Sequence, residues 1–357
     1  MNSFLIRVPN WIGDCIISLP AVAEVRRIHP RAEITVAARS WVADIYRVGG
    51  LVDDVIEYQS GARGPARLFR FAAELRRRKF SCALLLQNAM EAALLVRLAG
   101  IPRRIGYATD RRGFLLTDAV SVDPAVGRMH QSFYYLDLLT RSGLSNLDYA
   151  RLAGYRPDAR IRLSTEQHGM ADAFLSSIGV SPERPLAGIN PGAFFGSAKR
   201  WFPERYAAVA DYLAERHNMQ VLIFGSSNEI EIARRIEQNM KTRPFVLSGK
   251  TTLMELISLI NRCDLFITND SGPMHLASAL DRPMIALFGS TDETATGPLS
   301  GRSRVIHKPV ECTPCFLREC PIDLRCFKQI EVAEVCQIAD EMSPHWKARG
   351  VRPEALR

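Results

Sequence analysis

The chain has 357 residues, of which 47% are hydrophobic and 24% charged, so it holds enough apolar surface for two globular cores. No segment approaches the roughly 18 uninterrupted apolar residues of a membrane-spanning helix, and no secretory leader is visible, so we expect a cytoplasmic protein. The formal net charge of +8 lies entirely in residues 1–160, which carry 23 Lys and Arg against 15 Asp and Glu. This excess predicts an anionic partner, either a phospholipid surface or a phosphorylated or carboxylated acceptor. No nucleic-acid-binding signature accompanies it, so nucleic acid is not expected.

Short strand-like and helix-like segments alternate through the first half. The pattern predicts strands over residues 4–8, 32–38, 55–58 and 81–86. It also predicts a helix from Cys15 to Ile28, after a loop that contains Gly13 and Asp14. Strands that alternate with helices of this length indicate a parallel sheet covered on both faces.

The pattern restarts after a polar, proline-containing stretch at residues 155–165. It predicts helices over 204–216 and 229–239 and strands over 185–190, 220–224, 265–268 and, as the final strand, 283–288. We therefore expect an α/β protein with two tandem Rossmann-like doubly wound domains, residues 1–162 and 163–340, and a C-terminal tail, residues 341–357. Such sheets bind ligands at the carboxyl ends of their strands, so the active site is expected in a cleft between the domains.

The first candidate site loop, Asn10–Asp14, follows the first predicted strand. Gly13 would let the backbone approach a ligand closely, and Asp14 at the helix start could act on that ligand. The alternative is that Asp14 only caps the helix, because Asp is a favoured N-cap residue. The sequence leaves both interpretations open.

The second candidate loop joins Asn190, Pro191 and Gly192 to Lys199 and its neighbour Arg200. Small residues followed by a cation and a helix start could cradle a diphosphate, with backbone N–H donors and the charge of Lys199. The order of residues is not that of a P-loop. A solvated Lys-Arg pair is the alternative.

The third candidate loop follows the predicted strand at 265–268. Asp270 could accept hydrogen bonds from sugar hydroxyls, while Ser271, Gly272 and His275 would face phosphate oxygens at a helix N-terminus. A lone histidine is more often a satisfied, partly buried side chain, but its place in this loop favours the site.

Two further patterns concern cofactors. The Gly-x-Gly-x-x-Gly fingerprint is absent after the first strand, which argues against the alternative of an NAD-dependent oxidoreductase. Four cysteines in one short stretch could form a structural metal site or remain free thiols: Cys312, Cys315, Cys320 and Cys326.

The three loops resemble those of the lipopolysaccharide heptosyltransferases (glycosyltransferase family 9), which are inverting enzymes with the two-domain GT-B fold. The resemblance is carried by Val8-Pro9-Asn10-Trp11-Ile12-Gly13-Asp14, by Asn190-Pro191-Gly192-Ala193 with Ala198-Lys199-Arg200-Trp201, and by Thr268-Asn269-Asp270-Ser271-Gly272-Pro273-Met274-His275-Leu276. The segment Leu247-Ser248-Gly249-Lys250-Thr251 between them is also similar. Within the family, the chain is most similar to the subgroup that adds the second heptose. The resemblance implies transfer of L-glycero-D-manno-heptose from ADP-heptose to the heptose-Kdo-lipid A inner core. A family member that acts on Kdo, or uses another sugar, is the nearest alternative.

The resemblance also implies roles for the candidate residues. Asp14 would be the general base, Lys199 would bind the donor diphosphate, and Asp270 would hold the heptose. Ser271, Gly272 and His275 would complete the diphosphate site, and the N-terminal domain would take the anionic acceptor. Tentative acceptor contacts are Arg63, Arg104 and Arg128. With a cation and helix ends at the diphosphate, we expect catalysis without a metal or other cofactor, and peripheral association with the inner-membrane surface.

Overall fold

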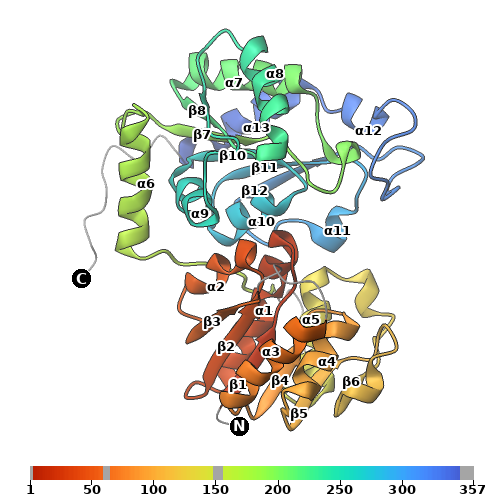
Figure 1. The fold of residues 1–357 in the computed structure, drawn as a ribbon. Coiled ribbons are helices and arrows are strands. Elements are labelled where there is room, and N and C mark those ends of the chain that lie inside the picture. The colour runs from red at the N-terminus through yellow and green to blue at the C-terminus, as the bar shows by residue number, and fades with distance from the viewer. Residues whose placement is uncertain (1–2, 59–64, 148–155, 346–357) are drawn as a thin grey trace. The chain divides into compact units, whose positions relative to one another are not determined.

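The computed structural model describes residues 3–58, 65–147 and 156–345. The chain divides into two compact units, Met1–Arg162 and Leu163–Arg357. Each unit is a parallel six-stranded sheet with helices on both faces (Figure 1). Within the described residues, no helix is both long and apolar enough to cross a bilayer.

The N-terminal sheet has the strand order β3-β2-β1-β4-β5-β6. Its strands are β1 (Ser3–Arg7), β2 (Glu33–Ala38), β3 (Asp54–Glu57), β4 (Cys82–Leu85), β5 (Arg103–Tyr107) and β6 (Asp118–Val120). The helices are α1 (Ile12–Ile28), α2 (Asp44–Arg47), α3 (Pro65–Arg77), α4 (Met90–Leu98) and α5 (Gln131–Arg141), with the short 3-10 turns η1 (Ser40–Val42), η2 (Gly113–Leu115) and η3 (Val126–Arg128). α1 packs against α5, and α3 packs against α4 over Leu5, Ala83 and Leu85 of the sheet.

The C-terminal sheet has the order β12-β11-β10-β7-β8-β9. Its strands are β7 (Leu186–Asn190), β8 (Gln220–Ile223), β9 (Phe245–Val246), β10 (Leu265–Asn269), β11 (Met284–Phe288) and β12 (Ser303–His307). The longer helices are α6 (Thr165–Ser177), α7 (Pro203–His217), α8 (Ile230–Asn239), α9 (Leu253–Arg262), α10 (Gly272–Ala279) and α13 (Val332–Met342); the shorter ones are α11 (Glu293–Thr296), α12 (Arg325–Lys328), η4 (Ser197–Lys199), η5 (Ser227–Glu229) and η6 (Ser343–His345).

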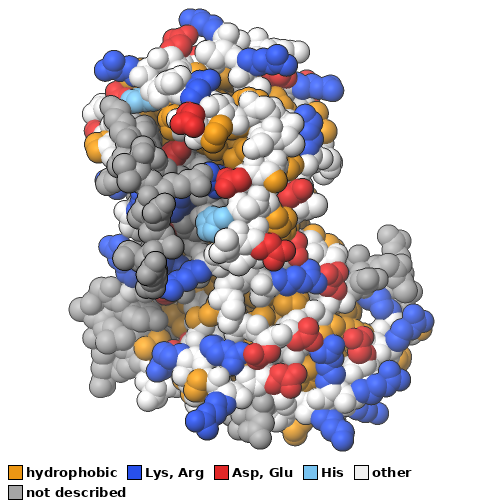
Figure 2. Space-filling view, turned by 90° about the vertical axis from the view of Figure 1, so that its left-hand side faces the viewer, with side chains coloured by type: hydrophobic (Ala, Val, Ile, Leu, Met, Phe, Trp, Pro, Cys, Tyr) orange, Lys and Arg blue, Asp and Glu red, His pale blue; other side chains and the backbone are white. Residues whose placement is uncertain are grey.

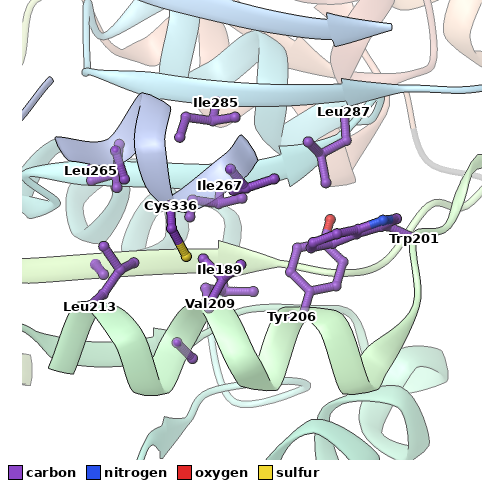
Figure 3. Close-up of a cluster of buried hydrophobic side chains, with 14 of the residues drawn as sticks. Ile189, Trp201, Tyr206, Val209, Leu213, Leu265, Ile267, Ile285, Leu287 and Cys336 are labelled. Atoms are coloured by element: carbon purple, nitrogen blue, oxygen red, sulfur yellow. The ribbon is translucent and has the colours of Figure 1, made fainter. Parts of the chain in front are cut away.

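The main core of this unit lies between the sheet and the layer of α7, α8 and α13 (Figure 3). Ile189, Ile267 and Leu287 come from three neighbouring strands and face Val209 of α7. Trp201 is 1% exposed and packs in this core. A side chain this deeply buried cannot stack on a substrate.

In both sheets the strand order reverses between the two central strands, which are β1 and β4 in the first unit and β7 and β10 in the second. Beyond such a switch point the two connections leave toward opposite faces, so the strand ends stay uncovered and ligands bind there. The loops after β1, β7 and β10 are the three candidate site loops. The fold thus brings the second and third loops, about 80 residues apart in the chain, to one edge of one sheet.

Two sequence predictions need correction. α1 begins at Ile12, three residues before the predicted start, so Asp14 lies in the helix and not in the preceding loop. The strand at 283–288 is not the last, because β12 follows it. β12, β6 and β9 are edge strands and β5 lies next to an edge; none of these has the long apolar run that marks a central strand of a parallel sheet.

Candidate functional site

Asp14 lies in the first turn of α1, at the carboxyl edge of the N-terminal sheet. β1 ends at Arg7, and Trp11 is the N-cap residue of α1. Asp14 is therefore the third helical residue and does not occupy the N-cap position. Its side chain is half-buried. A carboxylate in a first turn is stabilised by the helix dipole, and it is also available to a ligand at the strand ends.

The loop that leads to Asp14 is fixed by hydrogen bonds to Asn10. The Trp41 indole Nε1 donates to the Asn10 carbonyl at 2.8 Å, and Arg7 Nη2 donates to Asn10 Oδ1 at 3.4 Å. Trp41 lies in η1, just after β2. The connections after β1 and β2 are thus tied together at this edge.

Two buried asparagines end the central strands of the C-terminal sheet, Asn190 in β7 and Asn269 in β10. Asn269 Nδ2 donates to the Pro191 carbonyl at 2.7 Å, and its Oδ1 accepts from Trp201 N at 3.1 Å. Asn190 Nδ2 donates to the Ser271 hydroxyl at 3.3 Å. Asn269 was not among the predicted site residues. Its side chain links the loop after β7 to the segment just before α7.

Lys199 and Asp270 form a buried ion pair. Lys199 Nζ lies 2.5 Å from Asp270 Oδ2, and the side chains are 15% and 5% exposed. The Thr291 hydroxyl donates to the same Oδ2 at 2.7 Å. The residues predicted for the diphosphate and for the sugar are therefore in direct contact. Thr291 was missed, because it follows β11 and only the sheet brings it to Asp270.

Gly192 has no room for a side chain, because Glu229 lies directly against it. A Cβ there would lie 1.9 Å from Glu229 Oε1. Glu229 cannot easily move, since its Oε2 accepts from the Ser226 N–H at 2.7 Å and from the Ser226 hydroxyl at 2.9 Å. The loops after β7 and β8 therefore meet at Gly192, which defines one wall of the carboxyl edge.

The third loop leads into α10. Ser271 is its N-cap residue, but the side chain makes no capping bond; its hydroxyl lies 3.1 Å from Thr268 Oγ1. Gly272 is the first helical residue, and His275, in the first turn, is 7% exposed. A helix N-terminus that its N-cap side chain does not satisfy suits an anion.

Two buried hydroxyls at the same edge make no hydrogen bond with the described residues. The Oγ atoms of Ser248, after β9, and Ser290, after β11, have no hydrogen-bond partner among the described residues. A buried hydroxyl without a partner costs free energy that a polar ligand would recover. Ser290 could not be identified from the sequence, because no local pattern shows that it lies near Asp270 in the fold.

Of the three arginines expected to contact the acceptor, the structure describes two, and it places them on different elements. Arg63 lies outside the described residues. Arg104 is the second residue of β5, and its guanidinium donates to the carbonyls of Leu115 and Ile101 at 2.8 and 2.7 Å. Arg128 is exposed at the end of η3. The contacts of Arg104 give it a structural task, and its acceptor role stays a prediction.

The four clustered cysteines lie between β12 and α13 and are free thiols: Cys312, Cys315, Cys320 and Cys326. In the part of the chain that the structure describes, no group of three or more His, Cys, Asp or Glu side chains is arranged to hold a metal. The segment packs on the loops after β7 and β11, because Phe316 N donates to the Ser290 carbonyl at 2.8 Å and Ala198 N donates to the Arg318 carbonyl at 3.0 Å. A structural metal here stays a prediction from spacing.

Two doubly wound units in tandem define the class of the protein. One unit has a carboxylate at its switch point, and the other has a cation, a carboxylate and a helix N-terminus at its own. This is the GT-B glycosyltransferase fold, and the comparisons with known proteins agree with it.

The chain belongs to glycosyltransferase family 9 (heptosyltransferase), whose model matches residues 68–325. It is 34% identical to lipopolysaccharide heptosyltransferase 2 of Salmonella typhimurium, over 84% of this chain and 86% of that protein. It is 31% identical to lipooligosaccharide heptosyltransferase 2 of Haemophilus influenzae, over 85% of this chain and 88% of that protein. The structure of Escherichia coli ADP-heptose LPS heptosyltransferase II matches with a TM-score of 0.83 and 27% identity, covering 98% of this chain and all of that one.

Proposed function

We propose that the protein transfers L-glycero-D-manno-heptose from ADP-heptose to the heptose-Kdo-lipid A inner core of lipopolysaccharide. The observation that carries the proposal is the similarity over most of the chain to enzymes named heptosyltransferase 2. The arrangement at the two sheet edges supports it, because each edge offers the groups that one half of the reaction needs.

The donor is assigned to the C-terminal unit. The diphosphate would lie against Lys199 and the N-terminus of α10, with the hydroxyls of Ser271 and Ser290 as further donors. Lys199 and Thr291 both donate to Oδ2 of the Asp270 carboxylate, so Oδ1 can accept a bond from a heptose hydroxyl. Asp270 would then both hold the sugar and position Lys199.

The reaction needs a base for the acceptor hydroxyl and a cation for the leaving group. Asp14 is assigned as the base that takes the proton while the new bond forms. A single displacement on the face opposite the leaving ADP inverts the anomeric carbon through an oxocarbenium-like transition state. Charge that gathers on the diphosphate would be stabilised by Lys199 and the helix N-terminus more strongly in the transition state than before it.

No metal is assigned to catalysis, since Lys199 and the start of α10 can neutralise the leaving group. We expect full activity after treatment with EDTA, measured as ADP release. Metal analysis of the same samples, alongside a Cys312→Ser/Cys315→Ser variant, separates a structural metal at the thiols from a catalytic one. Activity that EDTA abolishes and Mg²⁺ restores, in wild type and variant alike, would contradict the assignment.

We assign the protein to the cytoplasmic surface of the inner membrane, where a lipid-linked acceptor would be met. The positive excess of residues 1–160 supports attraction to anionic lipids. On the face drawn in Figure 2, basic and acidic side chains are interspersed and do not form one large patch. Attraction of this kind would be reversible.

The deciding experiment is a transfer assay with ADP-heptose, in which Kdo-lipid A and heptose-Kdo-lipid A are offered separately and products are weighed by mass spectrometry. We expect a gain of one heptose on the second acceptor alone. A gain on the first acceptor would keep the family and change the step. Binding of ADP-heptose with no gain on either would refute the acceptor, and no binding would refute the donor.

A further inference from the structure

Three arginines surround one buried tyrosine at the carboxyl edge of the N-terminal sheet. Tyr58 directly follows β3, Arg39 directly follows β2, and Arg7 ends β1. The guanidinium carbons of Arg7, Arg39 and Arg67 lie 5.2, 4.5 and 4.3 Å from the centre of the Tyr58 ring. Since β3, β2 and β1 are neighbours in the sheet, this cluster belongs to the same edge as Asp14.

The cluster has more positive than negative charge. Among the described residues, Glu91 contacts the cluster: it accepts a hydrogen bond from the Tyr58 hydroxyl and lies 3.6 Å from Arg67 Nη2. Glu91 is itself half exposed. Burial, followed by repulsion from Arg39, lowers the pKa of Arg7 to about 10, and burial followed by the charge of Arg67 lowers the pKa of Arg39.

The three arginines differ in their hydrogen bonds. Arg7 is satisfied, because its Nη1 donates to the carbonyls of Val8 and Ala37 at 3.1 and 3.0 Å. Arg39 is not: its Nε and Nη1 are buried and have no hydrogen-bond partner among the described residues. Stacking on an aromatic ring is a common structural use of arginine, but it satisfies no N–H group. A charged donor that is buried and unpaired is costly, and an anion would remove the cost.

We propose that Arg39 and Arg67, stacked on Tyr58, bind an anionic group of the glycosyl acceptor, a carboxylate or a phosphate. This inference rests on the proposed function, which supplies an acceptor that carries both kinds of group. The planar fork of Arg39 suits two oxygens of one anion. The site is linked to the base, because Trp41, two residues after Arg39, donates to Asn10 in the loop that leads to Asp14. An anion held here would orient the acceptor relative to Asp14.

The test compares Arg39→Gln with Arg31→Gln, which removes the same charge from an exposed position in the same unit. For Arg39→Gln we expect the KM for the acceptor to rise about tenfold or more, with the KM for ADP-heptose and kcat little changed. Arg31→Gln should leave all three near wild type. An unchanged acceptor KM, or an equal rise in both KM values, would overturn the proposal. If Arg39→Gln does not fold, Arg39→Lys, which keeps the charge and loses the fork, should show a smaller rise in the acceptor KM alone.

Two modified acceptors identify the anion. One has its phosphates removed, and the other has its carboxylates reduced to alcohols. The acceptor that lacks the bound anion should bind the wild-type protein weakly, and Arg39→Gln should not reduce its affinity further. If Arg39→Gln weakens the binding of both modified acceptors as much as that of the unmodified one, the acceptor anion is not at Arg39 and the inference fails.

Direct binding of the unmodified acceptor, measured without donor, separates this inference from the proposed function. Wild-type binding that Arg39→Gln weakens, without transfer by either protein, would refute the reaction and keep the site. Transfer that Arg39→Gln leaves unchanged would support the reaction and refute the anion site at Arg39.

Discussion

Asp14 has two expected effects, one on the helix that contains it and one on the proposed reaction. Its place as the third residue of α1 gives a dipole interaction that is typically worth about 0.3–1 kcal/mol. General-base catalysis, in contrast, contributes a factor of roughly 10²–10⁴ in rate. The two effects differ enough in size, and in the property that they change, for one substitution to separate them.

We expect Asp14→Asn to lower kcat by about 100-fold or more, because the amide cannot take the proton. The affinity for ADP-heptose, measured by calorimetry, should stay unchanged. Glu166→Gln removes an exposed first-turn carboxylate from α6 and serves as the control for the helix effect. A rate for Asp14→Asn near that of the control would show that Asp14 only stabilises α1.

The buried pair of Lys199 and Asp270 has a structural effect and a proposed functional one. Removing one partner leaves a buried charge, which costs about 3–5 kcal/mol, whereas replacing both with neutral groups costs much less. We therefore expect Lys199→Met to lower the free energy of unfolding in urea by about 3 kcal/mol. The double variant Lys199→Met/Asp270→Asn should recover most of the stability.

Neither variant should recover ADP binding, because both lack the cation. Stability that stays low in the double variant would mean that the pair is not the cause of the loss. Normal ADP affinity in either variant would refute the diphosphate role of Lys199.

At the scale of elements, the proposed donor site depends on how closely the loops after β7 and β8 approach each other. Gly192 is required by contact and not by backbone conformation, since the clash comes from Glu229, which the Ser226 hydrogen bonds hold in place. A methyl group there must push the two loops apart, and it would disturb the loop that continues to Lys199.

We expect Gly192→Ala to destabilise the protein by about 1–3 kcal/mol, the usual cost of overpacking, and to weaken ADP binding. Gly169→Ala is the matched control. Gly169 lies in α6 with open space around it, so alanine should be neutral or stabilising by up to about 1 kcal/mol. Thermal unfolding and an ADP titration measure both effects. Equal behaviour of the two variants would show that Glu229 moves freely.

At the scale of the whole molecule, the charge is unevenly distributed, and the proposed membrane contact rests on this distribution. Residues 161–357 carry equal numbers of basic and acidic residues, so the net charge of +8 acts through the first half of the chain. Electrostatic attraction between exposed charges is screened within about 10 Å at 0.1 M salt and about 3 Å at 1 M. Salt should therefore control membrane contact.

We expect the full-length protein to sediment with vesicles that contain anionic lipids at low salt, and to be released as salt rises toward 1 M. Neutral vesicles provide the control and should retain little protein. Retention that is equal on both kinds of vesicle, or independent of salt, would point to apolar insertion and refute electrostatic contact.

The sequence by itself determined the two alternating strand–helix patterns, the central strands and the polar loops that end them. It could do so because a strand buried on both faces of a parallel sheet needs a continuous apolar run. Local composition was also enough to single out Asp14, Lys199 and Asp270. It did not identify β5, β6, β9 and β12, since strands at or near an edge are short and partly polar.

The tertiary structure alone decided which of these residues meet. The pairing of β7 with β10 brings Lys199 to Asp270 and makes them a buried ion pair, and β11 adds Thr291. The order of β3, β2 and β1 brings Arg7 and Arg39 to Tyr58, and α3 adds Arg67. Contacts between residues so far apart along the chain depend on strand order and packing, and no local pattern encodes either.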